Sequence, residues 1–120
     1  MSDSILDSVK LACGLLPSDD TFDDVLVMHT NAALANLNDV GVGPVEGFEI
    51  VNSVATWSDF LGTNKRLNKV TTYVCLHVRM LFDMPATSYA INAMEEQIRE
   101  ALWRAKVSVD QAEIEAEPTV

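Results

Sequence analysis

A chain of 120 residues, 48% of them hydrophobic, is long enough for one domain with its own core, since such a domain buries roughly two thirds of its unfolded surface. Its net charge of −10 argues against a protein that binds nucleic acid by neutralising phosphates, which requires clustered Lys and Arg. The longest apolar stretch, YVCLHVRMLF, is much shorter than the roughly 20 residues that span a membrane.

The N-terminus and the cysteines favour a protein made in the cytoplasm. Asp3 and Asp7 stand where a signal peptide would carry basic residues. Cys13 and Cys75 are therefore expected to be reduced thiols that pack in the core.

Charge is distributed unevenly along the chain. Residues 1–60 hold ten acids and one base (−9), residues 61–106 hold seven bases and four acids (+3), and residues 107–120 hold four acids (−4), which together give −10. The folded subunit should therefore present an acidic face and a more basic one.

Two helices are expected in the N-terminal third, at 4–13 and from about 22 to 38. The first should stop at Gly14, and the second follows Thr21 and Asp24, whose spacing resembles a capping box. Val27 and Leu34 fall on the side of the second helix that faces away from its core face. That predicted core face consists of Phe22, Val25, Leu26, His29, Ala32, Ala33, Asn36 and Leu37.

An irregular loop is predicted over 41–55, because GVGPVEG has three glycines and a proline in seven residues. Phe48, Ile50 and Val51 are expected to pack this loop, or a short strand, against the core. Thr56 and Asp59 then have the spacing of a helix N-cap and its third residue, which predicts one or two turns of helix.

A helical hairpin follows. The segment 65–83 has a wide apolar stripe, and Pro85 ends it at or just before Met84, because the proline ring disfavours a helical conformation of the preceding residue. Thr87 or Ser88 can cap a second helix that runs antiparallel to about residue 106. The predicted core stripes are Leu67, Val70, Tyr73, Val74, His77, Val78, Leu81 and Phe82 in the first helix, and Ile91, Met94, Ile98, Ala101, Leu102 and Ala105 in the second.

Together these elements predict an all-α fold, a small bundle of about four to five helices with a long central hairpin. We expect one helical domain at 1–106 and a flexible acidic tail at 107–120. The candidate residues for a subunit or partner interface are apolar or aromatic and face away from the predicted core: Val27, Leu34, Tyr89 and Trp103.

His77, Asp83 and Ser88 are the residue types of a nucleophilic triad. His77 and Asp83, however, are six residues apart on one helix and point about 120° apart, and Ser88 is better suited to a cap. We therefore predict no catalytic residue; a hydrolase using His29 or His77 is the least supported alternative.

Metal and cofactor sites are not predicted either. The two histidines and two cysteines have no CxxC, HxxxH or HExxH spacing. The acids of SDDTFDD suit helix capping, and GVGPVEG lacks the GK[ST] of a phosphate loop.

Four motifs in order resemble the small head-to-tail connector, or adaptor, proteins of tailed bacteriophages. They are ILDSVKLACGL, GVGPVEGF, ATWSDFLG and the hairpin that begins at NKVTTYVCLHVRMLFDMP, and the resemblance extends from residue 5 to about 107. The corner carries its most specific part, including Asp83, Pro85 and Ser88. The family pattern often has two prolines there, whereas this chain has Met84 and then Pro85.

The resemblance implies a structural virion protein, not an enzyme, that assembles as a ring of about twelve copies beneath the portal protein at the head-tail junction. It would extend the DNA channel and provide a docking surface for further connector or tail proteins. At −10 per copy, such a ring would carry about −120 and let double-stranded DNA pass without specific binding. The family's use of a C-terminal arm makes Val107, Val109 and Ile114 candidate portal-docking residues.

A different class of function stays open from the residues alone. A small acidic regulatory protein, such as an inhibitor that mimics DNA, would also be strongly negative and would act through protein contacts. Such a mimic would space its acids like phosphates along one exposed ridge, whereas here they cluster at helix starts.

Overall fold

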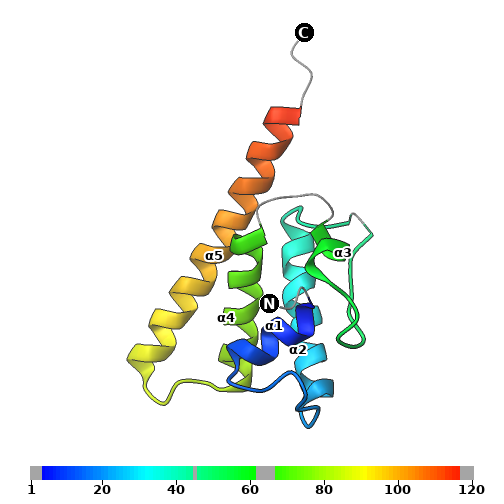
Figure 1. Cartoon of the computed structure of the whole chain (residues 1–120). Helices are drawn as coiled ribbons and strands as arrows, with labels where there is room; N and C mark the ends of the chain where they lie inside the picture. The colour runs from blue at the N-terminus through cyan, green and yellow to red at the C-terminus, as the bar shows by residue number, and fades with distance from the viewer. Residues whose placement is uncertain (1–3, 45, 62–66, 117–120) are drawn as a thin grey trace.

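The structure is a computed structural model that describes residues 4–44, 46–61 and 67–116 (Figure 1). The described ranges contain helices and loops, with a single β-bridge between Ser4 and Thr56 and no longer strand. This confirms the prediction of an all-α fold. The helices are α1 (Ile5–Ala12), α2 (Asp23–Asp39), α3 (Trp57–Leu61), α4 (Leu67–Phe82) and α5 (Ser88–Ala116).

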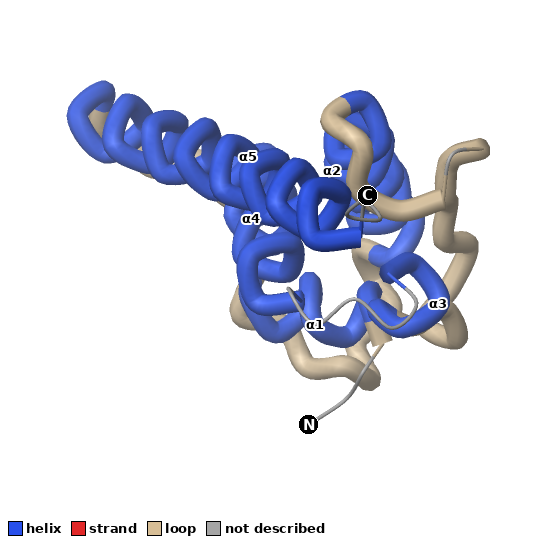
Figure 2. The backbone as a smooth tube through the Cα atoms, turned by 90° about the horizontal axis from the view of Figure 1, so that it is seen from above, coloured by secondary structure: helices blue, strands red, loops and turns tan. Residues whose placement is uncertain are grey.

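Helix α4 lies at the centre of the bundle and contacts α1, α2 and α5. Helix α5 runs antiparallel beside α4 and continues past its end, while α3 and the long loop before it lie on the other side of the molecule (Figures 1 and 2). The core of α4 is close to the predicted stripe, except that Leu81 is exposed. Its fully or almost fully buried residues are Val70, Tyr73, Val74 and Val78.

Helix α1 is held by interactions at both of its ends. The Asp7 N–H donates to Ser4 Oγ (3.3 Å), so Ser4 is the N-cap, and the Trp57 indole N–H of α3 donates to Ser8 Oγ (3.0 Å). At the other end Lys10 is only 2% exposed, and its Nζ lies 2.7 Å from Asp23 Oδ1 at the start of α2. This ion pair, which the sequence analysis missed, joins α1 to α2.

The core face predicted for α2 is confirmed at Leu26, Ala33 and Leu37, which are fully buried, but it is wrong at other positions. Leu34 is fully buried and Val27 packs partly buried against the core, whereas Phe22 and Val25 are 40% and 42% exposed. The physical reason is that apolar residues surround most of this helix, so contacts with α1, α4 and the 41–56 loop decide which side is buried. Val27 and Leu34 are therefore not exposed interface residues.

Two of the three N-caps predicted for α2, α3 and α5 are confirmed. Thr56 and Asp59 form a reciprocal capping box, with Asp59 N–H donating to Thr56 Oγ1 and Thr56 N–H donating to Asp59 Oδ2, both at 3.0 Å. Thr87 Oγ1 caps α5 by accepting the Ala90 N–H (3.1 Å). The capping box predicted at Thr21 is wrong, because α2 begins at Asp23 after Phe22, which makes no side-chain cap bond.

The observed end of α4 agrees with the prediction, whereas the observed end of α5 does not. Helix α4 ends at Phe82, as Pro85 predicts, while its expected start at 65 lies outside the described residues. Helix α5 continues to Ala116, so the prediction that its helix ends near 106 is wrong. In the long loop, Ile50 is buried as expected, but Val51 is 83% exposed.

A Thr30→Val substitution should stabilise the protein by about 1 kcal/mol. Thr30 is fully buried in α2 and its hydroxyl has no hydrogen-bond partner among the described residues, so the nearly isosteric valine removes an unsatisfied polar atom without opening a cavity. Urea unfolding should show a higher midpoint with an unchanged slope. A lower midpoint would show that the hydroxyl is satisfied in solution.

Candidate functional site

The three triad residue types are not brought together. His77 is half-buried on α4 with its ring 5.7 Å from that of Tyr73, and burial, followed by the nearby His29, lowers its pKa. Asp83 and Ser88 are exposed at the corner, and no hydrogen bond joins either of them to His77 in the described part of the chain. These three residues therefore do not form a nucleophile, base and orienting acid in hydrogen-bonding contact with one another.

The cysteines are free thiols, partly buried against the core. Burial, with a smaller contribution from Cys13, raises the pKa of the Cys75 thiol to about 11. Burial also raises the pKa of Cys13. Neither thiol has the lowered pKa of a reactive nucleophile.

The described residues form neither a metal-binding cluster nor a membrane-spanning helix. No group of three His, Cys, Asp or Glu side chains lies close enough there to hold a metal ion. Among the described helices, none is long and apolar enough to cross a membrane.

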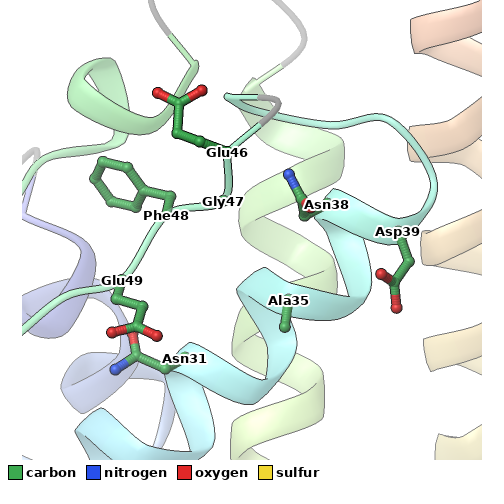
Figure 3. Close-up of a pocket in the computed structure, with 8 residues that line it drawn as sticks. All are labelled: Asn31, Ala35, Asn38, Asp39, Glu46, Gly47, Phe48 and Glu49. Atoms are coloured by element: carbon green, nitrogen blue, oxygen red, sulfur yellow. The ribbon is translucent and has the colours of Figure 1, made fainter.

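A groove of about 340 Å³ lies between the C-terminal half of α2 and the loop after it (Figure 3). We call it the acidic groove, because three carboxylates surround it: Asp39 at the end of α2, and Glu46 and Glu49 on the loop. Its other lining residues are Asn31, Ala35, Asn38, Gly47 and Phe48.

Two asparagines of α2 hold the loop that forms one wall of this groove. Asn31 accepts the Ile50 N–H at Oδ1 (2.7 Å) and donates from Nδ2 to the Ile50 carbonyl (3.0 Å). Seven residues later on the same side of the helix, Asn38 Nδ2 donates to the Pro44 carbonyl (2.5 Å). The groove is thus built on an irregular loop whose backbone is paired by side chains rather than by a sheet.

Replacing Asn31 by alanine should destabilise the protein by about 2 kcal/mol, since it leaves both polar groups of buried Ile50 without their partner. Hydrogen exchange of the Ile50 amide should accelerate more than that of amides in α4. Asn31→Asp is the matched control: it keeps the acceptor for the Ile50 N–H but cannot donate to the carbonyl, so the amide should stay better protected than in the alanine variant. Equal protection in all three proteins would contradict the assigned hydrogen bonds.

Helix α5 exposes a face that carries aromatic and basic residues, with the acids Glu95 and Glu96 near the same side. Arg99, Trp103, Lys106 and Val107 recur at spacings of four, three and one residues, which places them on one side of the helix, and all four are exposed. We call this set the α5 outer face. Trp103 is 63% exposed, and Tyr89, nearer the corner, is 85% exposed.

A comparison with protein families matches residues 5–112 to the phage connector proteins. The chain belongs to that family. Searches of curated proteins and of solved structures gave no match. Family membership supports a structural role as a head-to-tail connector in general, at the junction of head and tail and in contact with portal or tail proteins.

The residues predicted to matter in a connector lie in different parts of the fold. The corner residues Asp83, Pro85 and Ser88 lie where α4 is joined to α5, which supports the prediction that they form a turn between two helices. Tyr89 and Trp103 are exposed, as predicted, although no contact tests their role as interface residues.

The candidate portal-docking residues Val107, Val109 and Ile114 all fall within α5. Val107 is 40% exposed, while the side chains of the other two lie outside the description. Sequence reasoning missed the acidic groove, whose only early signal was the pair Asn31 and Asn38 at a spacing of two helical turns.

Proposed function

We propose that this connector binds the portal protein as a ring, extends the DNA channel below it, and offers a docking surface to the next connector or tail protein. The observation that carries the proposal is the family match over residues 5–112, which includes every described helix up to the last turn of α5. The proposed copy number, about twelve, comes from the resemblance of the sequence to ring-forming adaptors.

The shape of the subunit supports assembly into a ring. Helix α5 continues beyond the bundle at one end, so its C-terminal turns are available to a second protein (Figure 1). Exposed Tyr89 and Trp103 are residues of the kind that dominate binding energy at protein interfaces. We propose that residues 107–120 contact the portal, with Val107, Val109 and Ile114 as the apolar contacts.

The charge of the subunit supports passage of DNA rather than its binding. A net charge of −10 repels the phosphate backbone over roughly a Debye length, about 8 Å at physiological ionic strength. Two acids have local structural uses that a DNA mimic would not need. Asp23 pairs with Lys10. Asp19 accepts the Thr21 N–H (3.1 Å), and hydrogen bonds from the side chain and then the backbone of Thr21 lower the pKa of Asp19. The connector function is therefore favoured over an inhibitor.

Co-expression with the portal protein of the same phage tests this function. The full chain should co-elute with the portal in size-exclusion chromatography, and a chain ending at residue 106 should lose most of that co-elution. The circular dichroism spectrum of the shortened chain should lose only the helical signal of the α5 turns that were removed. Asp83→Ala, an exposed change at the corner, is the control that should bind normally. Recovery of a nuclease or repressor instead of the portal would favour the inhibitor.

A further inference from the structure

Helix α5 extends beyond the helices that support it. Among its described side chains the last buried one is that of Ala105, and Val107 is already exposed. The helix nevertheless continues to Ala116, so that residues 107–116 add about 15 Å to its length. We call these residues the α5 overhang. No other described helix lies alongside it in Figure 1, so it is open to a partner.

The overhang and the residues that follow it carry charge of one sign. Residues 107–120 contain four acids and no Lys or Arg; the acids are Asp110, Glu113, Glu115 and Glu117. Glu113 and Glu115 belong to the last turn of α5, which has no basic residue. The unpaired carbonyls at the C-terminus of a helix carry partial negative charge, so acids are unfavourable there and cations are favourable.

The first residues of the overhang are weak helix formers. The run Val107, Ser108, Val109 and Asp110 consists of residue types that rank below Ala, Leu, Lys and Glu in helix propensity. Helices in proteins are stabilised mainly by packing against other elements. Local chemistry therefore does little to stabilise the helical overhang in the free subunit, and a partner that supplies positive charge would stabilise it.

A second copy of this chain does not offer such a surface in its described part. Four of the six bases in the described ranges already have ion pairs or other interactions: Lys10, Lys69, Arg104 and Lys106. The other two, Arg79 and Arg99, lie on different helices, and Glu95 lies one turn before Arg99. Charge complementarity therefore favours a different protein as the partner of the overhang.

We propose that the portal protein holds the α5 overhang in a basic site, which supplies Lys or Arg side chains to Asp110, Glu113 and Glu115 and to the carbonyl end of the helix. This inference rests on the proposed portal binding and names the chemistry that the portal surface must have. Exposed Val107 adds an apolar contact at the base of the overhang. Because the charges act through solvent, binding is sensitive to salt.

Neutralising the acids tests the basic site. The overhang variant is the full chain with Asp110→Asn, Glu113→Gln and Glu115→Gln, titrated calorimetrically with the purified portal protein of the same phage at about 100 mM and about 500 mM NaCl. At the lower salt this variant should bind at least about tenfold more weakly than the wild type. The wild type should itself lose at least about tenfold in affinity at the higher salt, and the variant much less.

The helicity of the free variant should change in the opposite direction to its affinity. Neutral residues no longer oppose the helix dipole, so circular dichroism should show at least as much helix in the free overhang variant as in the wild type. Weaker binding would then come from lost charge and not from a lost helix. A variant that binds the portal as tightly as the wild type would overturn the inference.

The acidic groove supplies a matched control. Asp39→Asn with Glu46→Gln and Glu49→Gln makes the same three kinds of change at exposed positions on another part of the chain. This control should bind the portal like the wild type. If it weakens binding as much as the overhang variant does, total charge and not the overhang governs the affinity, which contradicts the basic site.

The outcomes separate this inference from the proposed function. A wild-type chain that does not bind the portal would overturn both. If the wild type binds and the chain ending at residue 106 does not, while the overhang variant binds normally, the connector function stands and the basic site is wrong. If the overhang variant binds the portal normally but loses self-association in sedimentation equilibrium, the overhang docks on a second copy, which also contradicts the inference.

Discussion

Gly43→Ala should destabilise the protein by about 3–4 kcal/mol. Gly43 has φ +85°, a region that L side chains rarely adopt, and a Cβ there would overlap Cε1 of the Phe60 ring. Phe60 is only 2% exposed and packs on Phe48, so it cannot move aside without disturbing the loop beside the acidic groove. Urea unfolding measures the loss directly.

Gly47→Ala is the matched control for that experiment. Gly47 has φ +94°, but nothing lies within 4 Å of the Cβ that alanine would add, so only the backbone strain of about 1–2 kcal/mol is expected. In a Gly43→Ala/Phe60→Leu double variant, the smaller side chain should relieve part of the clash, so the two costs should not add. Equal destabilisation by the two alanine substitutions would show that Gly43 does not contact Phe60.

Replacing each residue of the buried ion pair between α1 and α2 should lower the stability of the protein by a different amount. Asp23→Ala leaves the Lys10 ammonium almost fully buried, with the Pro17 carbonyl at 3.1 Å as its one acceptor in the described part of the chain, and should cost about 2–3 kcal/mol. Lys10→Met removes the buried charge and keeps the side-chain length, but it leaves the buried Oδ1 of Asp23 without its cation, although the aspartate side chain as a whole is 35% exposed. That variant should lose about 1–2 kcal/mol, less than Asp23→Ala.

Thermal unfolding of the two variants and of the Lys10→Met/Asp23→Ala double variant closes a thermodynamic cycle. The double variant should be close to Lys10→Met alone, because the cost of removing Asp23 comes from the lysine it leaves behind. A double variant as unstable as Asp23→Ala would mean that the aspartate acts through the start of α2 and not through Lys10.

Local signals predicted the parts of the fold that local chemistry decides. The capping box of Thr56 and Asp59 formed, and Pro85 ended α4, because both effects act within a few residues. The sequence also contained a signal for helix in the 107–120 segment, since no glycine or proline occurs between the core stripe of α5 and Pro118. The acidic composition of this segment led instead to the prediction of a flexible tail.

Features that depend on distant partners were not predictable from one sequence. Leu34 is buried because α2 is enclosed on several sides, and periodicity alone selects only one face. Lys10 interrupts an apolar run in the sequence, yet it is buried, because Asp23 lies next to it in the fold. The acidic groove arises from Asn31 binding the backbone of Ile50, nineteen residues away, which no spacing rule indicates.

The central claim is that this chain connects the head of a phage particle to its tail. Quantitative mass spectrometry of purified, DNA-filled particles tests it most directly, by comparing the number of copies of this chain with that of the portal protein. We expect one copy per portal subunit, retained when the particles are washed in high salt. Filled, tailed particles that contain the portal but lack this chain would contradict it.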